Sequence, residues 1–189
     1  MQNRPDLSVP TYDWLEDARD LDRCKAEILA LLNESVLDDG MLGYDAALTR
    51  AEEASFLAHW QWLLAHGSAK VLLATQREKP LAMAFMRVNR NSNYRHVADL
   101  SKGFISSQAR GGAILKELFA RICQRAESMG VEQLTLDTRE GSRALGVWRH
   151  FGFETFGVMP DYSRFDGRSH SGHFMSQRVA KLKEFIREK

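Results

Sequence analysis

ADLSKGFISSQARGGAILKELFARICQRAESM, residues 98–129, has the pattern of a strand, a loop of small residues and a helix. The helix carries an apolar stripe at three- and four-residue spacing, formed by Ile114, Leu115, Leu118, Phe119, Ile122, Ala126 and Met129. Arg110-Gly-Gly-Ala113 stands where the first-turn N–H groups of that helix lack intrahelical partners. Because glycine lets the backbone approach an anion and the helix dipole favours it, the loop is interpreted as a phosphate cradle. An ordinary strand-to-helix turn is the alternative interpretation.

Two common nucleotide-binding loops are missing from the sequence. The chain contains neither G-x-x-x-x-G-K-[ST] nor G-x-G-x-x-G. A nucleoside triphosphatase or a dinucleotide-binding enzyme is therefore not indicated.

The loop does match another diphosphate-binding element. Gln108–Ala113 satisfies [QR]-x-x-G-x-[GA], and so resembles the loop with which GNAT superfamily N-acetyltransferases bind the pyrophosphate of coenzyme A. Further elements downstream resemble the GNAT group that contains the tabtoxin-resistance acetyltransferase. They are Leu134-Thr-Leu-Asp137-Thr138, Gly141-Ser142, His150-Phe-Gly152-Phe153, Gly157-x-x-Pro160-x-Tyr162 and Asp166-Gly167-Arg168. Order and spacing match from about residue 98 to 165, with a one-residue difference near Phe165, and a looser resemblance reaches back to about Thr11.

The resemblance implies an α/β fold with a mixed, mostly antiparallel central sheet flanked by helices, and acetyl-CoA as co-substrate. In the register of that group, Arg110 falls on the first position of the loop motif. Ala113 and Leu115 then occupy two positions that are usually small, and Trp148 stands where the family has a tyrosine near the coenzyme sulfur. The residues expected to contact the coenzyme are Phe104, Ile105, Arg110, Gly111, Gly112, Ala113, Ile114, Leu115, Ser142 and Trp148.

Composition is consistent with an ordinary folded domain. A chain of 189 residues with 44% hydrophobic content suits a single domain over 1–189, with 1–10 and 180–189 as terminal extensions. With a net charge of +1, the chain has no excess of basic residues of the kind that binds nucleic acid or an anionic membrane. No apolar run approaches the roughly 20 residues of a membrane span, and the first residues lack an apolar signal segment. Together with two cysteines interpreted as free thiols, this predicts a cytoplasmic protein.

The remaining elements follow from periodicity and turn residues. Strands are predicted at 11–15, 69–76, 81–88, 96–105, 133–137, 154–159 and 173–178. Helices are predicted from a cap at Asp17 or Asp20 to Leu32, and over 49–66, 111–129 and 142–151, with a helical tail from 180. Loops are expected at 38–44 and between the last two strands.

Acyl transfer to an amine needs a base, because a primary amine has a pKa of about 10 and is protonated at neutral pH. Asp137, at the carboxyl end of a buried strand, is the first candidate for this base, and Asp99 on the neighbouring strand is the second. In the resembled group, the corresponding carboxylates are the proposed proton-transfer pair. A capping or turn role for Asp137 and an ion-paired surface role for Asp99 remain the alternatives.

The position of Trp148 raises the question of a general acid. An indole donates a hydrogen bond but does not transfer a proton at physiological pH. Either the coenzyme thiolate leaves unassisted, or another group such as Tyr162 or water protonates it. Trp148 is otherwise interpreted as a core aromatic, and Tyr162 as a packing residue. His170 and His173 have no Cys, Asp or Glu partner nearby in the sequence, so no metal site is expected.

The resemblance implies an N-acetyltransferase that moves an acetyl group from acetyl-CoA directly to an amine, and the residues add a candidate phosphate cradle and base. The acceptor, a small molecule or a peptide, is not identified by the sequence, and neither nucleic acid nor a membrane is an expected partner. A homodimer is compatible with the sequence. Two alternatives remain: a catalytically silent GNAT fold that serves as an acyl-CoA sensor or protein-interaction module, and an unrelated α/β binding module without coenzyme A affinity.

Overall fold

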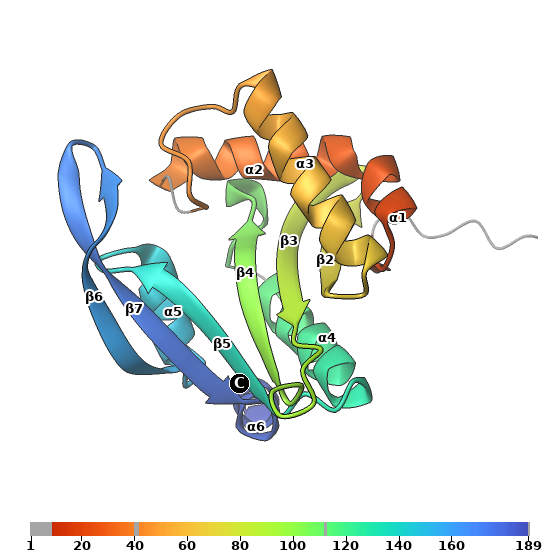
Figure 1. Ribbon diagram of the computed structural model, residues 1–189, viewed down its shortest axis with the longest axis vertical. Helices are drawn as coiled ribbons and strands as arrows, with labels where there is room; N and C mark the ends of the chain where they lie inside the picture. The colour runs from red at the N-terminus through yellow and green to blue at the C-terminus, as the bar shows by residue number, and fades with distance from the viewer. Residues whose placement is uncertain (1–8, 40–41, 112, 189) are drawn as a thin grey trace, which may run out of the picture.

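The chain is built around a single mixed sheet (Figure 1). The computed structural model describes residues 9–39, 42–111 and 113–188; for Asp39 it describes the backbone alone. The strand order is β1-β2-β3-β4-β5-β7-β6, and β4 and β5 form the one parallel pair among these neighbours. The strands are β1 Thr11–Leu15, β2 Ala69–Gln76, β3 Lys79–Val88, β4 Val97–Ile105, β5 Gln133–Arg139, β6 Glu154–Phe165 and β7 Arg168–Arg178. The predicted fold class, a mostly antiparallel sheet flanked by helices, is confirmed.

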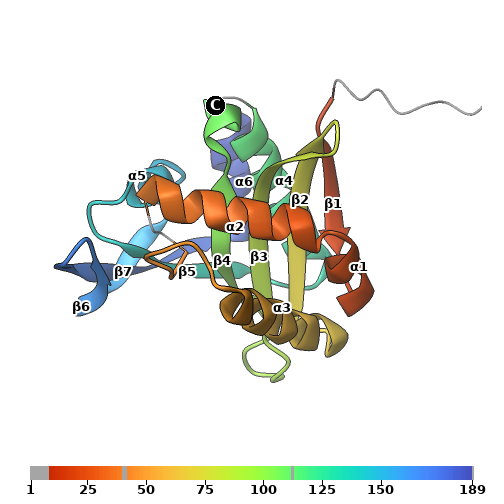
Figure 2. The ribbon, with the colours of Figure 1, turned by 90° about the horizontal axis from the view of Figure 1, so that it is seen from above.

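Helices cover both faces of the sheet (Figure 2). They are α1 Ala18–Arg23, α2 Lys25–Asp39, α3 Arg50–Ala65, α4 Ile114–Ser128, α5 Arg143–His150 and α6 Val179–Glu188, with a short 3₁₀ turn, η1, at Ser107–Ala109. Side chains of β2 alternate between the faces: Val71 packs with α1–α3, and Leu72 packs in the cluster that includes α4. The central strands are therefore buried on both sides, which explains their nearly continuous apolar sequence.

The N-terminal helix differs from the prediction in its bounds. Asp17 caps α1, and Asp20 reciprocates by accepting a hydrogen bond from the backbone N–H of Asp17. The helical path is interrupted at Cys24 and resumes as α2, which continues to Asp39. The loop predicted to start at residue 38 was thus placed too early, because the acidic pair Asp38-Asp39 extends the helix rather than ending it.

The prediction of a loop between the last two strands is wrong. β6 and β7 form a long hairpin, joined by a two-residue turn in which Asp166 and Gly167 have φ of +50° and +68°. Asp-Gly is a strong signal for this turn and could have been recognised. Pro160 lies within β6, where the pairing register shifts between Met159 and Ser163, and this irregularity accommodates it.

The parallel pair of β4 and β5 opens partway along its length. Pairing runs only from Val97 opposite Gln133 to Asp99 opposite Thr135, although β4 continues to Ile105 and β5 to Arg139. The two strands visibly diverge beyond this point (Figure 1). Their carboxyl ends therefore frame an opening in the middle of the sheet.

The C-terminal helix α6 is part of the packed structure. α6 packs with α4, and its Val179 and Leu182 are buried in the core, so the residues expected as a charged extension contribute to packing. No helix within the described ranges combines the length and apolar character required to cross a membrane.

Candidate functional site

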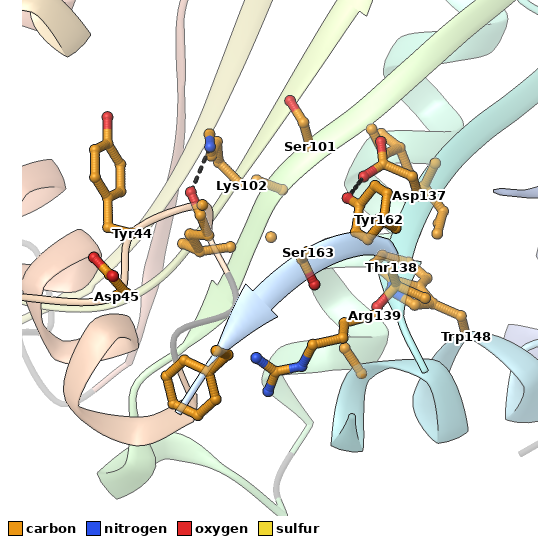
Figure 3. Close-up of a pocket in the computed structure, with 18 of the residues that line it drawn as sticks. Tyr44, Asp45, Ser101, Lys102, Asp137, Thr138, Arg139, Trp148, Tyr162 and Ser163 are labelled. Atoms are coloured by element: carbon orange, nitrogen blue, oxygen red, sulfur yellow. Dashed lines mark hydrogen bonds between the residues drawn. The ribbon is translucent and has the colours of Figure 1, made fainter. Parts of the chain in front are cut away.

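A cavity of about 670 Å³ fills the opening between β4 and β5 (Figure 3). Most of its walls come from four segments far apart in the sequence: residues 42–45 after α2, 100–103 of β4, 136–139 of β5 and 162–165 of β6. Hydroxyl, carboxylate, ammonium and guanidinium groups all reach it. We call this space the larger cavity. It is a polar site at the carboxyl ends of two parallel strands, where open α/β sheets place ligands.

A smaller, mostly apolar cavity of about 370 Å³ adjoins it. It lies between the end of β4, the loop before α4, and the faces of α4 and α5. The residues that line both cavities are Ala84, Gly103, Ile122, Ala144 and Trp148. The two spaces therefore meet at one wall, with Gly103 and Trp148 on it.

An irregularity in β4 shapes this wall. Phe85 pairs with Ser101 and Met83 with Phe104, so β4 has one residue more than β3 between these pairs. Lys102 takes up the bulge with φ of +49°, a conformation that lysine rarely adopts. A bulge changes the direction of a side chain. Here the Lys102 side chain points into the larger cavity.

Lys102 was missed by the sequence reasoning. Its Nζ donates a hydrogen bond of 2.5 Å to the carbonyl oxygen of Leu42 and lies 5.7 Å from the centroid of the Tyr44 ring. Burial lowers the pKa of Lys102, and the negative charge of Asp137 opposes this only in part. Lys102-Gly103 inside an otherwise regular strand was the available signal, because glycine there often marks a bulge.

Asp137 and Tyr162, both predicted site residues, meet in the larger cavity. The Tyr162 hydroxyl donates a hydrogen bond to Oδ2 of Asp137. Burial, together with this hydrogen bond and the charge of Asp137, raises the pKa of Tyr162, so the phenol stays protonated. Tyr162 lies on β6 rather than on a loop, directly after Asp161, whose φ is +50°. Its ring lies across Gly172 of β7, where a Cβ atom would overlap it.

Asp99 lies outside the lining of both cavities. Its Oδ1 is 3.7 Å from Nε of Arg87, and the Thr135 hydroxyl donates to its Oδ2 at 3.4 Å. Burial raises the pKa of Asp99; Arg87 opposes this rise and the charge of Asp137 adds to it. Because Asp99 is paired with Thr135, two residues before Asp137, both carboxylates are on the same face of the sheet.

Six of the residues expected to contact the coenzyme line the smaller cavity. They are Phe104, Ile105, Arg110, Gly111, Leu115 and Trp148. The helix itself begins at Ile114, three residues later than predicted, with Ala113 as its N-cap. Gly111 has a φ of +78°, which explains why glycine is needed there, whereas Ala113 at −70° has an ordinary conformation.

The other expected contacts are placed differently. Ile114 packs against the hydrophobic core, and Gly112 lies outside the described residues. The buried Ser142 is the N-cap of α5, accepting a hydrogen bond from the Leu145 N–H and donating to the Arg139 carbonyl. Ser142 thus positions α5 beside the smaller cavity.

Carboxylates of α2 hold the loop before α4, a contact that the sequence did not reveal. Nη1 and Nη2 of Arg110 donate to the two oxygens of Asp38 at 3.0 and 2.5 Å. Arg143 Nη1 is 3.5 Å from the same carboxylate. Glu34 Oε1 accepts hydrogen bonds from the Ser106 hydroxyl and from both the N–H and the hydroxyl of Ser107. These pairs join segments about 70 residues apart, so only the folded chain brings them together.

Trp148 packs against the hydrophobic core and also lines the two cavities. Its ring packs against Phe119 and Phe153, with centroid distances of 5.5 and 5.1 Å. The same ring lines both cavities, and a Cβ at Gly103 would lie 3.8 Å from it. Trp148 is therefore a core aromatic that also separates the two cavities.

Comparison with solved structures shows which fold this is. No protein-family model matches the chain, and no curated protein matches it in sequence. A GNAT superfamily phosphinothricin acetyltransferase from Sinorhizobium meliloti in complex with acetyl-CoA superposes with a TM-score of 0.69 at 23% identity, over 89% of this chain and 88% of that one. An N-acetyltransferase from Staphylococcus aureus gives 0.70 at 17% identity, over 91% and 99%. A ribosomal-protein-alanine N-acetyltransferase from Brucella melitensis gives 0.66 at 22% identity, over 90% and 99%. The chain has the GNAT acetyltransferase fold.

Proposed function

We propose that this protein is an N-acetyltransferase that moves an acetyl group from acetyl-CoA directly to an amine. The observation that carries the proposal is the meeting of the two cavities at Gly103 and Trp148. A thioester delivered through the apolar cavity and an amine bound in the polar cavity would come together at that wall. Direct transfer then needs positioning and proton transfer, but no covalent enzyme intermediate.

Acetyl-CoA fits the smaller cavity by chemistry. The apolar walls suit the pantetheine arm, while the loop before α4 offers N–H donors to a diphosphate at a helix N-terminus, beside the Arg110 guanidinium that Asp38 holds in place. The GNAT-fold structure from Sinorhizobium meliloti contains acetyl-CoA. Leu115 lines this cavity and restricts its width, so we expect it to influence affinity rather than the choice of coenzyme.

Asp137 is proposed as the base. The acceptor enters as an ammonium ion, and its proton passes to the Asp137 carboxylate, directly or through the Tyr162 hydroxyl that donates to it. The free amine then attacks the thioester carbon, the C–S bond breaks, and the coenzyme leaves as a thiolate. Tyr162 is the proposed proton relay: its phenol protonates the thiolate and regains a proton from the nitrogen, which loses its second proton as the amide forms. Asp99 would act indirectly, through its charge near Asp137.

Calorimetry with acetyl-CoA, followed by release of free thiol in the presence of a panel of amines, tests the proposal. We expect saturable binding and amine-dependent thiol release. Asp137→Asn keeps the size of the side chain but removes its basicity, so kcat should fall by roughly 10²–10⁴-fold with little change in coenzyme affinity. Coenzyme binding without thiol release from any amine would instead identify the silent sensor, and an absence of binding would contradict both.

A further inference from the structure

Among the described residues that line the larger cavity, Lys102 is a cation for which no ion pair is found. In the part of the chain that the structure describes, Lys102 Nζ forms no salt bridge: it donates to the Leu42 carbonyl and lies near the Tyr44 ring, and the charge of Asp137 acts on it without an ion pair. An ammonium group has three donors, and one hydrogen bond uses only one of them. Burying a charge is unfavourable unless an opposite charge compensates it. The cavity is therefore complementary to an anion at this end.

The other cations of the cavity are already engaged. Arg164 forms an ion pair with Asp161, at 2.9 Å between Nη2 and Oδ2. The guanidinium of Arg139 lies 4.5 Å from the centroid of the Phe165 ring. Lys102 differs from Arg164, because its ammonium faces a carbonyl dipole and an aromatic ring rather than a carboxylate.

Lys102 and the proposed base lie on opposite sides of the larger cavity. Figure 3 shows Lys102 beside Tyr44 at one side, and Asp137 with Tyr162 at the other. The negative side suits the ammonium of an acceptor and the positive side suits an anionic group of the same molecule. Since the loop at 42–45 and the bulge of β4 together hold Lys102, this end of the cavity is formed by the fold rather than by a flexible surface lysine.

We propose that the acceptor is an amine that also carries an anionic group, such as a carboxylate, and that Lys102 binds this group. The inference rests on the proposed function and names the class of its acceptor. Lys102 is a specificity-determining residue in this scheme, and the acceptor's anion supplies the ion-pair partner that Lys102 lacks among the described residues. A neutral amine of the same shape would leave the Lys102 ammonium without a partner when water is displaced.

The test uses matched pairs of acceptors and one neutral variant. The probes are α-amino acids and their α-carboxamides, which have similar shape but lack the negative charge, assayed by thiol release with saturating acetyl-CoA. Lys102→Met keeps most of the length of the side chain and removes its charge. Lys181→Met, on the exposed surface of α6, is the control for loss of a lysine elsewhere.

We expect kcat/KM for the best amino acid to exceed that for its carboxamide by at least about tenfold. Lys102→Met should raise KM for the acid by a similar factor, with a smaller effect on kcat, and should abolish the preference over the carboxamide. Lys181→Met should retain the preference. Calorimetry should show that both variants bind acetyl-CoA like the wild type, which also establishes that they fold.

Two results would overturn the inference while leaving the proposed function intact. One is equal or better transfer to the carboxamides in the wild-type protein. The other is an equal loss of kcat for acid and carboxamide in Lys102→Met, which would make Lys102 a proton-transfer group instead. An absence of thiol release from every amine, charged or neutral, would overturn the proposed function and this inference with it.

Discussion

At the scale of single residues, Gly172 determines where Tyr162 lies. A side chain at this position would overlap the Tyr162 ring, which crosses the strand to reach Asp137. Gly157, in the same hairpin, has room for a methyl group, since its nearest neighbour would be the Phe174 Cβ at 4.0 Å. The glycine at 172 is thus needed for placement of a neighbour rather than for its own backbone conformation.

We therefore expect Gly172→Ala to displace the Tyr162 hydroxyl and reduce kcat, by roughly tenfold or more if Tyr162 transfers a proton. Gly157→Ala should be close to wild type. In a Tyr162→Phe background, Gly172→Ala should have little further effect, because the hydroxyl is already missing. Steady-state kinetics of the four variants measure this coupling. Additive losses would mean that Gly172 acts independently of Tyr162.

A second prediction at this scale concerns Trp148. If a missing phenol limits protonation of the leaving thiolate, Trp148→Tyr should increase kcat without changing coenzyme affinity, because the proton is needed only as the C–S bond breaks. Loss of packing against Phe119 and Phe153 should lower stability by ~1 kcal/mol or more. Single-turnover rates and thermal unfolding measure the two effects separately. An unchanged kcat would assign protonation to Tyr162 or to water.

At the scale of elements, the loop before α4 depends on Gly111 and on the carboxylates of α2. Gly111 has a φ of +78°, and a Cβ atom added there would have none of the described neighbouring atoms within 4 Å, so substitution strains the backbone without a clash. Gly130, at the end of α4, has a similar φ of +71° and equally open surroundings. The two positions form a matched pair, one at the smaller cavity and one remote from it.

Gly111→Val should weaken acetyl-CoA binding by about tenfold or more, because valine disfavours the left-handed conformation that aims the loop amides at the diphosphate. Gly130→Val should cause comparable destabilisation, of about 1–2 kcal/mol, without the loss of affinity. Calorimetry and chemical denaturation distinguish these effects. Equal affinity in both variants would remove the loop from the coenzyme site.

At the scale of the whole molecule, α4 joins the two halves of the opened sheet. Its buried Cys123 packs under α6, 4.0 Å from the Val179 carbonyl, and burial raises the pKa of its thiol to about 12. Cys24 is only partly buried. Since the thiolate is the reactive form, Cys123 should react only when this part of the core opens.

Iodoacetamide at pH 8 should therefore modify Cys24 well before Cys123 in the native protein. Saturating acetyl-CoA should slow the reaction of Cys123 further, because a ligand bound along α4 stabilises the closed form by mass action. Peptide mapping by mass spectrometry gives both rates. Reaction of the two thiols at equal rates would show that α4 opens independently of the rest of the core.

Much of the fold could be predicted because the forces that form its elements act over a few residues. Apolar periodicity predicted β2 and α3 closely, and the loop of small residues was placed correctly between β4 and α4. Local sequence patterns predicted the wrong structure where the same pattern is compatible with two different structures. A loop was expected after residue 159, yet β6 continues through an irregularity to Phe165, and Asp38 extended a helix that turn residues were expected to end.

The sequence alone determined the fold class and the residue types available for chemistry, whereas the tertiary structure decided which of them meet. Asp137 and Tyr162 are 25 residues apart, and Arg110 and Asp38 are 72 apart. No local preference encodes these contacts, because they depend on which strands are neighbours and on where pairing ends. The bulge that turns Lys102 into the cavity arises from mismatched pairing between β3 and β4. Packing of distant elements, rather than propensity, therefore assembled the site.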